Sequence, residues 1–509
     1  MAVTLHKQAN CGFVMLNSPP VNAINQKMRE DLIDAVTWAE SEGLERVILS
    51  GMGRSFAAGA DTKEFDHPAI SPHLPDVVNR IETSTVPWIA AIHGTALGGG
   101  GELALGCRYR IARADATIGF PEVILGLVPG AGATQRLPRL VGLAEALKLI
   151  PTGKTISGKA AMAIGLVNAI DDDPVAAAKL IDQKILSEAV PLSLMKAGTD
   201  KTVSYDTARQ LAIRRMRGQE APLTAISLLE TAQTATFDDG MQKERNAFLA
   251  LRASPQARAL RHIFFAERAA KKPPKAIETQ KPTLKPLNHV IVIGGGTMGS
   301  GIAYAFLNAN IRVTILESDD AGMQRANTAI DTIISASLAS GHIDPQAATD
   351  RRNLLKVMMI QPDSDAGKRR NDDLTNVDLV IEAVFEDLAI KKEILQAIEP
   401  ALDPNAIIAT NTSYLDVNKL AACLDNPSRF VGLHFFAPAH IMKLLEIVKG
   451  SETSPVALSM AYAVAKSLGK IPVVAGVCDG FIGNRILAAL REAADATLMD
   501  GSTPAEIDR

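Results

Sequence analysis

Two hydrophobic patterns alternate along the second half of the chain. Short apolar runs, each bounded by glycine or polar residues, are separated by longer segments with helical spacing. The runs lie at 289–293, 311–316, 378–383, 406–410 and 430–433. Alternation of this kind predicts a parallel, doubly wound α/β sheet.

The first half combines strand-like and helical patterns. Residues 46–50 and 87–93 are apolar runs between chain breakers, whereas 131–150 has helical spacing. From 191 to 270 the pattern consists of long amphipathic helices, which we expect to form a bridge outside the first core. Residues 271–286 are rich in lysine and proline and predict an exposed linker, because prolines block regular pairing.

Composition narrows the class of protein. The 509 residues are 47% hydrophobic and 21% charged with a net charge of −3, which predicts a globular protein without a basic surface for nucleic acid. No stretch reaches the roughly 18–20 apolar residues of a membrane span, and the N-terminus lacks a signal-peptide pattern. The four cysteines are scattered and suggest neither disulfides nor a metal site. We therefore expect a cytoplasmic protein without a bound metal.

The glycine loop at 294–299 follows an apolar strand and opens a helix. Its spacing fits G-x-G-x-x-G, where the first glycine makes the turn, the second admits a pyrophosphate and the third permits close packing. Glu317 ends the next strand and would bind the adenosine ribose, which favours NAD because a carboxylate repels the 2′-phosphate of NADP. The predicted cofactor-binding residues are Gly294, Gly296, Thr297, Met298, Gly299 and Glu317.

A second glycine run, 98–101, precedes a helix that carries Glu102. Free N–H groups at such a helix start, together with one from the loop 56–61, could form an oxyanion hole. Glu122 follows Pro121 at the end of a predicted strand, and two carboxylates beside an oxyanion hole could position water and shuttle its proton. Taken singly, each glutamate also fits an ordinary solvated or ion-paired side chain.

These motifs resemble two known families. Residues 1–190 resemble the crotonase (enoyl-CoA hydratase/isomerase) family through NSPPVNAIN, SFAAGADTKEF, IAAIHGTALGGGGELALGC and FPEVILGLVPGAGATQRLPR. Residues 289–509 resemble 3-hydroxyacyl-CoA dehydrogenases through the glycine loop, EAVFED, NTSYL, GLHFFAPAHIMKLLEIV and GFIGNR. In this order the two halves are similar to the multifunctional β-oxidation enzymes, closest to the peroxisomal type.

The resemblance implies an α/β architecture with five segments. A crotonase-type ββα spiral domain would occupy residues 1–190, followed by a helical bridge and a linker. A Rossmann domain and the start of an all-α dehydrogenase domain would complete the chain, which ends at Arg509, just inside that last domain. The remaining expected ranges are 191–270 for the bridge, 271–286 for the linker, 287–470 for the Rossmann domain and 471–509 for the helical start.

The resemblance also implies roles for individual residues. In the first half, the N–H groups of Ala60 and Gly99 would hold the thioester oxygen, while Glu102 and Glu122 would add water to C3 and a proton to C2. The same pair could move a double bond, which gives isomerase activity.

In the second half, His434 would take the proton of the 3-hydroxyl while hydride leaves to NAD. Glu446 would orient the imidazole, and Ser413 and Asn484 would bind the reacting oxygen.

These features predict a bifunctional enzyme acting on acyl-CoA thioesters, with a thiolase or a second copy as its partner and peroxisomes as an alternative compartment. One alternative is an active hydratase/isomerase whose dehydrogenase half binds NAD but is inactive for lack of its helical domain. Another is a CoA- and NAD-binding scaffold or sensor, and a third is mainly an isomerase. The two acid–base pairs favour the bifunctional enzyme, because a pure binding protein needs neither pair.

Overall fold

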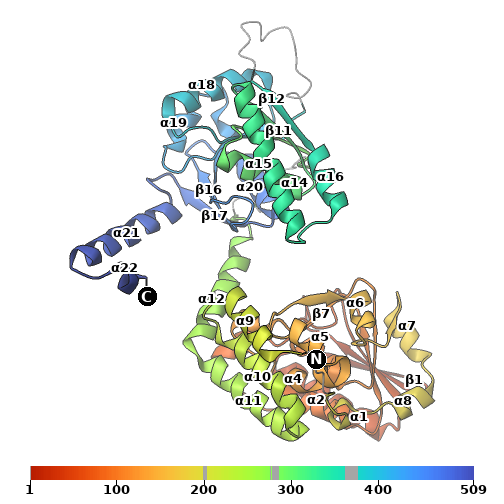
Figure 1. The fold of residues 1–509 in the computed structure, drawn as a ribbon. Helices are drawn as coiled ribbons and strands as arrows, with labels where there is room; N and C mark the ends of the chain where they lie inside the picture. Colours follow the sequence, from red (N-terminus) through yellow and green to blue (C-terminus); the bar gives the residue numbers. More distant parts are fainter. Residues whose placement is uncertain (1, 199–202, 276, 278–285, 361–375, 509) are drawn as a thin grey trace. The chain divides into compact units, whose positions relative to one another are not determined.

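The computed structural model describes residues 2–198, 203–275, 277, 286–360 and 376–508. The chain forms two compact units, Met1–Phe265 and Ala266–Arg509 (Figure 1). Most of the predicted linker lies outside the described residues. In the described part of the chain, no helix has both the length and the apolar character needed to cross a membrane.

The first unit is built on a six-stranded sheet with the order β1-β2-β3-β4-β6-β9. β1 runs antiparallel to β2, and the other neighbours are parallel. A smaller sheet has the order β5-β7-β8. The strands are β1 Val3–Gln8, β2 Cys11–Leu16, β3 Arg46–Gly51, β4 Trp88–Ile92, β5 Thr95–Leu97, β6 Tyr109–Ala112, β7 Thr117–Gly119, β8 Thr155–Ser157 and β9 Ala169–Ile170.

Helices cover both faces of the larger sheet. The main core lies on the face covered by α1, α2 and α3, and a smaller apolar cluster beneath α7 and α8 covers the other face. The helices up to residue 194 are α1 Gln26–Ser41, η1 Thr62–Asp66, α2 Leu74–Glu82, α3 Gly99–Gly106, η2 Pro121–Leu125, α4 Ala133–Val141, α5 Leu143–Leu149, α6 Gly158–Ala163, α7 Pro174–Lys179, α8 Gln183–Glu188 and η3 Leu192–Leu194.

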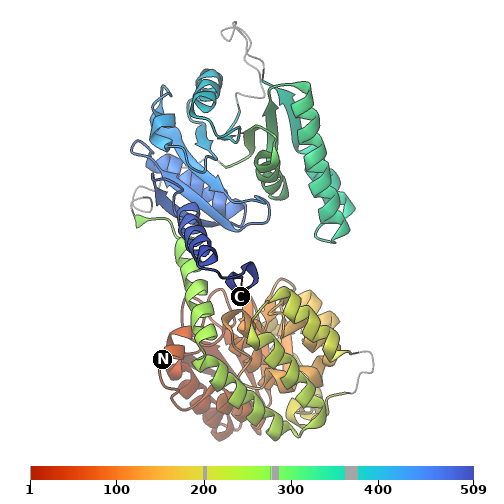
Figure 2. The same cartoon turned by 60° about the vertical axis from the view of Figure 1, so that its left-hand side comes forward.

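Four described helices lie between residues 194 and 271, and the last three of them contribute buried residues to the first core. The four are α9 Tyr205–Arg215, α10 Glu220–Thr234, α11 Phe237–Ala253 and α12 Pro255–Ala270. Figures 1 and 2 show α10 and α11 side by side against the first unit. Leu229 and Leu251 are buried in the same cluster as the sheet residues. This packing corrects our expectation of a bridge outside the first core, since α10 and α11 bury apolar residues against α4 and its neighbours.

The second unit contains an eight-stranded sheet with the order β12-β11-β10-β13-β14-β15-β16-β17. Only the β15–β16 pair is antiparallel among the described strands of this sheet. The strands are β10 His289–Ile293, β11 Arg312–Glu317, β12 Leu355–Met359, β13 Leu379–Glu382, β14 Ile407–Thr410, β15 Phe430–Phe435, β16 Leu444–Lys449 and β17 Ile471–Gly476. The predicted doubly wound fold is confirmed, because the five predicted strands are β10, β11, β13, β14 and β15.

Helices pack on both faces of this sheet (Figure 1). One core lies beneath α14, α15 and α20, and the other beneath α18 and α19. The helices are α14 Thr297–Asn308, α15 Asp320–Ala339, α16 Pro345–Asn353, α18 Leu388–Ile398, η4 Glu399–Ala401, α19 Val417–Ala421, η5 Pro427–Arg429, α20 Pro455–Ser467, α21 Gly483–Met499 and α22 Pro504–Ile507.

Residues 471–476, which we expected to open the all-α domain, instead form β17. Their sequence, IPVVAG, contains the β-branched residues that favour a strand, and they pair in parallel with β16. Helical structure therefore begins at Gly483, after the sheet is complete.

Candidate active sites

The first candidate site lies where α3 begins. Gly98 precedes this helix with a φ of +51°, and a Cβ on it would lie 2.8 Å from Oε1 of Glu122. Glycine is therefore required here both by the backbone conformation and by the close approach of the carboxylate. Glu122 lies in the first turn of η2 and not at the end of a strand, because Pro121 breaks the chain after β7 and starts the 3-10 turn.

Two backbone N–H groups face the same place. A Cβ on Gly99 would lie 3.4 Å from the nitrogen of Ala60, so the two predicted oxyanion-hole residues are neighbours. The Ala60 loop is held by Ile24, which donates to the Gly59 carbonyl at 2.9 Å. Among the described residues, neither Ala60 N–H nor Gly99 N–H has a hydrogen-bond acceptor. Both donors can therefore bind an oxygen of a substrate.

Glu102 and Glu122 form a coupled carboxylate pair. Glu102 is 2% exposed, and its Oε1 accepts hydrogen bonds from Ala131 N–H at 2.8 Å and Ala133 N–H at 3.1 Å. Burial raises the pKa of Glu102. Burial and the charge of Glu102 raise the pKa of Glu122 well above its usual range. In the described part of the chain, Oε2 of Glu122 is buried without a hydrogen-bond partner, so burial disfavours the charged form of Glu122 most strongly.

Sequence reasoning missed a third buried carboxylate, that of Glu244 in α11. It is 1% exposed and accepts hydrogen bonds from Gly132 N–H at 2.6 Å and from the N–H and hydroxyl of Thr134 at 2.9 Å and 2.6 Å. Its helix was expected to lie outside the first core, and an isolated glutamate in an amphipathic helix carries no local signal of burial.

The second candidate site joins β15 and β16. The antiparallel register places His434 directly opposite Glu446, and Nδ1 of the histidine lies 2.7 Å from Oε2 of the glutamate. The other oxygen of Glu446 accepts hydrogen bonds from Ile482 N–H at 3.1 Å and Gly483 N–H at 2.8 Å, where α21 begins. Burial would raise the pKa of Glu446, but the bonds from His434 and the two N–H groups outweigh it and lower that pKa.

Ser413 lies on the other side of the imidazole. Its Oγ is 3.3 Å from Nε2 of His434, so the serine, the histidine and Glu446 form one line of polar groups. Asn484 follows Gly483 in the first turn of α21 and is half-buried. The structure thus brings Ser413, His434 and Glu446 together, and places Asn484 next to the backbone that binds Glu446.

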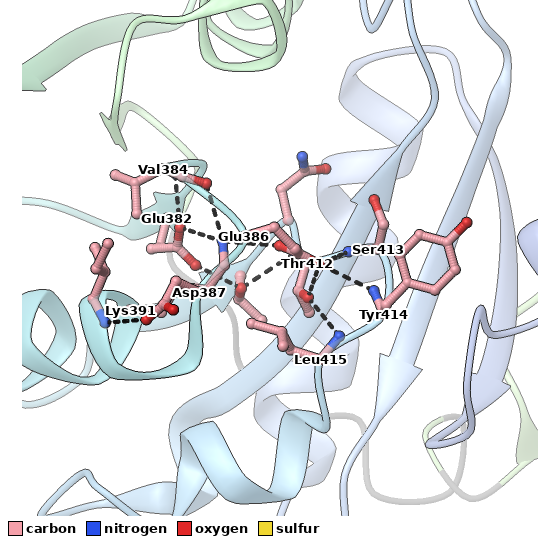
Figure 3. Close-up of polar contacts among 12 residues, drawn as sticks. Glu382, Val384, Glu386, Asp387, Lys391, Thr412, Ser413, Tyr414 and Leu415 are labelled. Carbon is pink, nitrogen blue, oxygen red and sulfur yellow. Dashed lines mark hydrogen bonds and ion pairs between the residues drawn. The ribbon is translucent and has the colours of Figure 1, made fainter.

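A network of hydrogen bonds around Glu386 holds the loop that carries Ser413 (Figure 3). Oε1 of Glu386 accepts hydrogen bonds from the Thr412 hydroxyl at 2.6 Å, Ser413 N–H at 2.7 Å and Tyr414 N–H at 3.1 Å. Its Oε2 lies 3.3 Å from Nζ of Lys391. The EAVFED motif contains Glu386, but the contact between Glu386 and the Ser413 loop could not be predicted from the sequence, because the sequence does not show which loops lie together.

The buried Lys391 also pairs with Glu382, with Nζ 2.7 Å from Oε1. These side chains are 1% and 0% exposed. Replacing Lys391 by Met should lower the free energy of unfolding of the second unit by about 3–5 kcal/mol, because Glu382 would keep a buried charge without its cation. Urea unfolding followed by amide exchange in β13 measures the effect. Lys466→Met, at an exposed position, is the control, and an equally small loss in both variants would contradict the prediction.

The predicted glycine loop has the geometry of a pyrophosphate cradle. A Cβ on Gly299 would lie 1.7 Å from the Gly294 carbonyl oxygen, so helix and strand can pack this closely only with glycine. A Cβ on Gly296 would meet nothing within 4 Å, which leaves open space before the first N–H groups of α14, at Thr297 and Met298. Oε1 of Glu317 accepts the Gly295 N–H, so the carboxylate lies at the loop. The residues present fit NAD.

Together the folds and sites define a class of enzyme with two separate centres. One centre combines paired carboxylates with two free N–H donors, and the other combines a His–Glu pair with a dinucleotide-binding loop. The chain matches the family described as "Enoyl-CoA hydratase/isomerase" over residues 6–243 and "3-hydroxyacyl-CoA dehydrogenase, NAD binding domain" over residues 289–478.

Similarity to curated proteins extends over nearly the whole chain. The "Peroxisomal bifunctional enzyme" of Cavia porcellus is 37% identical over 100% of this chain and 70% of its own length. The human protein of that name is 36% identical over 97% of this chain and 68% of its own length. The "Fatty acid oxidation complex subunit alpha" of Shewanella baltica is 33% identical over 95% of this chain and 69% of its own length.

The chain therefore belongs to the family of bifunctional fatty-acid β-oxidation enzymes. It combines an enoyl-CoA hydratase with an NAD-dependent 3-hydroxyacyl-CoA dehydrogenase, as the sequence predicted. The alternative with an inactive dehydrogenase half gains no support from these matches.

Proposed function

We propose that Glu102 and Glu122 together hydrate a trans-2-enoyl-CoA. Oxygen of water bonds to C3 while Glu102 takes the water proton, and the electrons of the double bond move towards the thioester oxygen. The N–H groups of Ala60 and Gly99 stabilise the negative charge on that oxygen. Glu122 then delivers its proton to C2, which gives the 3-hydroxyacyl-CoA. The observation that carries this proposal is the coupled, buried carboxylate pair beside two free N–H donors.

The same pair supports a second activity, isomerisation of a 3-enoyl-CoA to a 2-enoyl-CoA. One carboxylate removes a proton from C2, and the other returns a proton to C4, while the same N–H groups hold the enolate oxygen. The matched family is described as hydratase/isomerase, which agrees with this use of one site.

In the second unit we propose that His434 takes the proton of the 3-hydroxyl group through Nε2. NAD, when bound, accepts the hydride from C3. Glu446 fixes the imidazole through Nδ1 and stabilises its protonated form, since its own charge is held by the N–H groups at the start of α21. Ser413, whose Oγ lies 3.3 Å from Nε2, and Asn484 of α21 would hold the reacting oxygen so that its proton faces Nε2.

Glu317, with Gly294, Gly296, Thr297, Met298 and Gly299, would hold NAD. Replacing Glu317 by Gln should weaken NAD binding about 10–100-fold, because a hydrogen bond to a charged acceptor contributes roughly 1.5–3 kcal/mol. Calorimetric titration with NAD and NADP measures the change, with Glu452→Gln as an exposed control. Unchanged affinity for both cofactors would remove Glu317 from the proposed site.

The direct test of the function uses the pure protein and a short trans-2-enoyl-CoA, first without and then with NAD. Loss of the enoyl thioester absorbance reports hydration, and gain of NADH reports oxidation. Hydration followed by NADH formation supports two working sites in series. Hydration without NADH, even from added 3-hydroxyacyl-CoA, would contradict the role of the second site, and no loss of enoyl-CoA would contradict that of the first.

Two broader proposals, on the compartment and on the partner, rest on the relatives and on the chemistry of the product. The names of the mammalian relatives place those proteins in peroxisomes, so the peroxisome is the compartment to test against the cytoplasm with a tagged protein. A thiolase, which cleaves 3-ketoacyl-CoA, is the proposed partner beside a second copy of this chain. Light scattering with and without a thiolase tests both. We further propose that the domain built on the sheet β10 to β17 binds NAD, and that the helices after β17 belong to a separate domain.

A further inference from the structure

The turn formed by residues 131–134, where α4 begins, lies between two buried carboxylates. Its first and third N–H groups donate to Glu102 at 2.8 Å and 3.1 Å. Its second and fourth N–H groups donate to Glu244 at 2.6 Å and 2.9 Å. The two carboxylates therefore bind alternate donors of one turn.

This arrangement couples the position of Glu102 to that of Glu244. Gly132 has a φ of +104°, which glycine adopts freely but other residues rarely do. No side chain restricts the backbone there, so the hydrogen bonds that the turn donates to the two carboxylates hold its shape. Glu244 accepts two of these hydrogen bonds, and it accepts a third from the Thr134 hydroxyl at 2.6 Å. If the turn relaxes, the two N–H groups that orient Oε1 of Glu102 move with it.

We propose that Glu244 is a positioning residue of the hydratase site, which fixes the turn 131–134 and thereby aims the free oxygen of Glu102 at the attacking water. The proposal rests on the proposed role of Glu102 and makes α11 part of the hydratase machinery. Glu244 itself would touch neither the acyl-CoA nor the water.

The electrostatic coupling of Glu244 to Glu102 and Glu122 agrees with a positioning role. Burial and the charge of Glu102 raise the pKa of Glu244 to about 8. The charged groups that act on Glu244 in the described structure are Glu102 of α3, Glu122 of η2 and Arg245, the next residue of α11. The charge of Glu244 raises the pKa of Glu122, so its removal should lower the pKa of Glu122 in the pH range near 8 and above, where Glu244 is ionised.

A purely structural role for Glu244 is the competing explanation, since α11 packs closely on α4. A Cβ on Gly240 would lie 2.1 Å from Oε1 of Gln135. A packing role alone would alter stability and the amount of folded enzyme. It would not lower kcat while KM stays unchanged.

The test compares the full chain with Glu244→Gln, which keeps the size of the side chain and removes its charge. We expect kcat for hydration to fall on the order of 10–100-fold, because small misplacement of a catalytic group costs about that much. KM for the enoyl-CoA should stay within about twofold, since Glu244 makes no contact with the thioester. The bell-shaped pH profile of kcat should move to lower pH. Asp238→Asn, at an exposed position in the same helix, is the matched control.

Each outcome of this test either supports or contradicts the positioning role of Glu244. A folded E244Q enzyme with unchanged kcat, or one in which kcat falls and KM rises together, would overturn the positioning role. If E244Q melts below the assay temperature, Thr134→Val, which removes only the hydroxyl donor, replaces it: a lower kcat supports the proposal and a wild-type kcat overturns it. Failure of the proposed function is recognised separately, because Glu122→Gln would then hydrate at the wild-type rate.

Discussion

Replacing Glu122 by Gln is expected to reduce hydration of a trans-2-enoyl-CoA by about 10²–10⁴-fold, the usual contribution of a positioned acid or base. Glutamine has nearly the same size and shape as glutamate, so it can take the same position next to Gly98 and the loop should keep its conformation. It has no carboxyl proton to deliver to C2, which is the step that Glu122 performs in the proposed mechanism. KM should change little, because the N–H groups of Ala60 and Gly99 still bind the thioester oxygen.

The variant carries its own internal control. Oxidation of added 3-hydroxyacyl-CoA should continue at the wild-type rate in Glu122→Gln, because that chemistry uses residues of the other compact unit. Glu188→Gln, at an exposed position of the first unit, should hydrate normally. Loss of enoyl absorbance at the wild-type rate in Glu122→Gln would exclude this residue as the acid. Loss of both activities together would indicate unfolding instead.

The second site was largely predictable from the sequence because its parts are set by local pattern. The apolar run 289–293 predicts a strand, the glycine spacing after it predicts a tight turn into a helix, and Glu317 marks the end of the next strand. Each of these predictions follows from the residue types and their spacing alone. His434 and Glu446 are different, since their meeting depends on antiparallel pairing of β15 with β16. Resemblance to known dehydrogenases, and not periodicity, brought that pair together before the structure.

What the sequence did not predict depends on contacts between distant segments. In the sequence, Glu244 is indistinguishable from any glutamate of an amphipathic helix, and only the packing of α11 on α4 shows that it is buried. Glu386 likewise looks like a loop residue until the structure shows the three groups that donate hydrogen bonds to it. The pattern of 191–270 showed amphipathic helices but not which core receives their apolar faces. The short run at 471–476 was not predicted as a strand because it lies beyond the expected end of the Rossmann domain at 470. Its parallel partner, β16, was not among the predicted strands either.

Replacing His434 by Gln is expected to reduce oxidation of 3-hydroxyacyl-CoA by about 10²–10⁴-fold, because the proton of the hydroxyl then has no base. Glutamine can still accept or donate a hydrogen bond near Ser413, so the site keeps polar contacts but loses proton transfer. Binding of NAD should be unchanged, since the glycine loop and Glu317 lie on other elements of the sheet.

The measurement combines NADH formation from 3-hydroxyacyl-CoA with calorimetric titration of NAD for the same variant. His342→Gln, at an exposed position, is the matched control and should oxidise normally. Glu446→Gln should resemble His434→Gln in rate, because the amide cannot stabilise the protonated imidazole through Nδ1. Hydration must persist in both variants. A His434→Gln enzyme that binds NAD and forms NADH at the wild-type rate would show that another group takes the proton, and would leave Glu446 with a structural role at the start of α21.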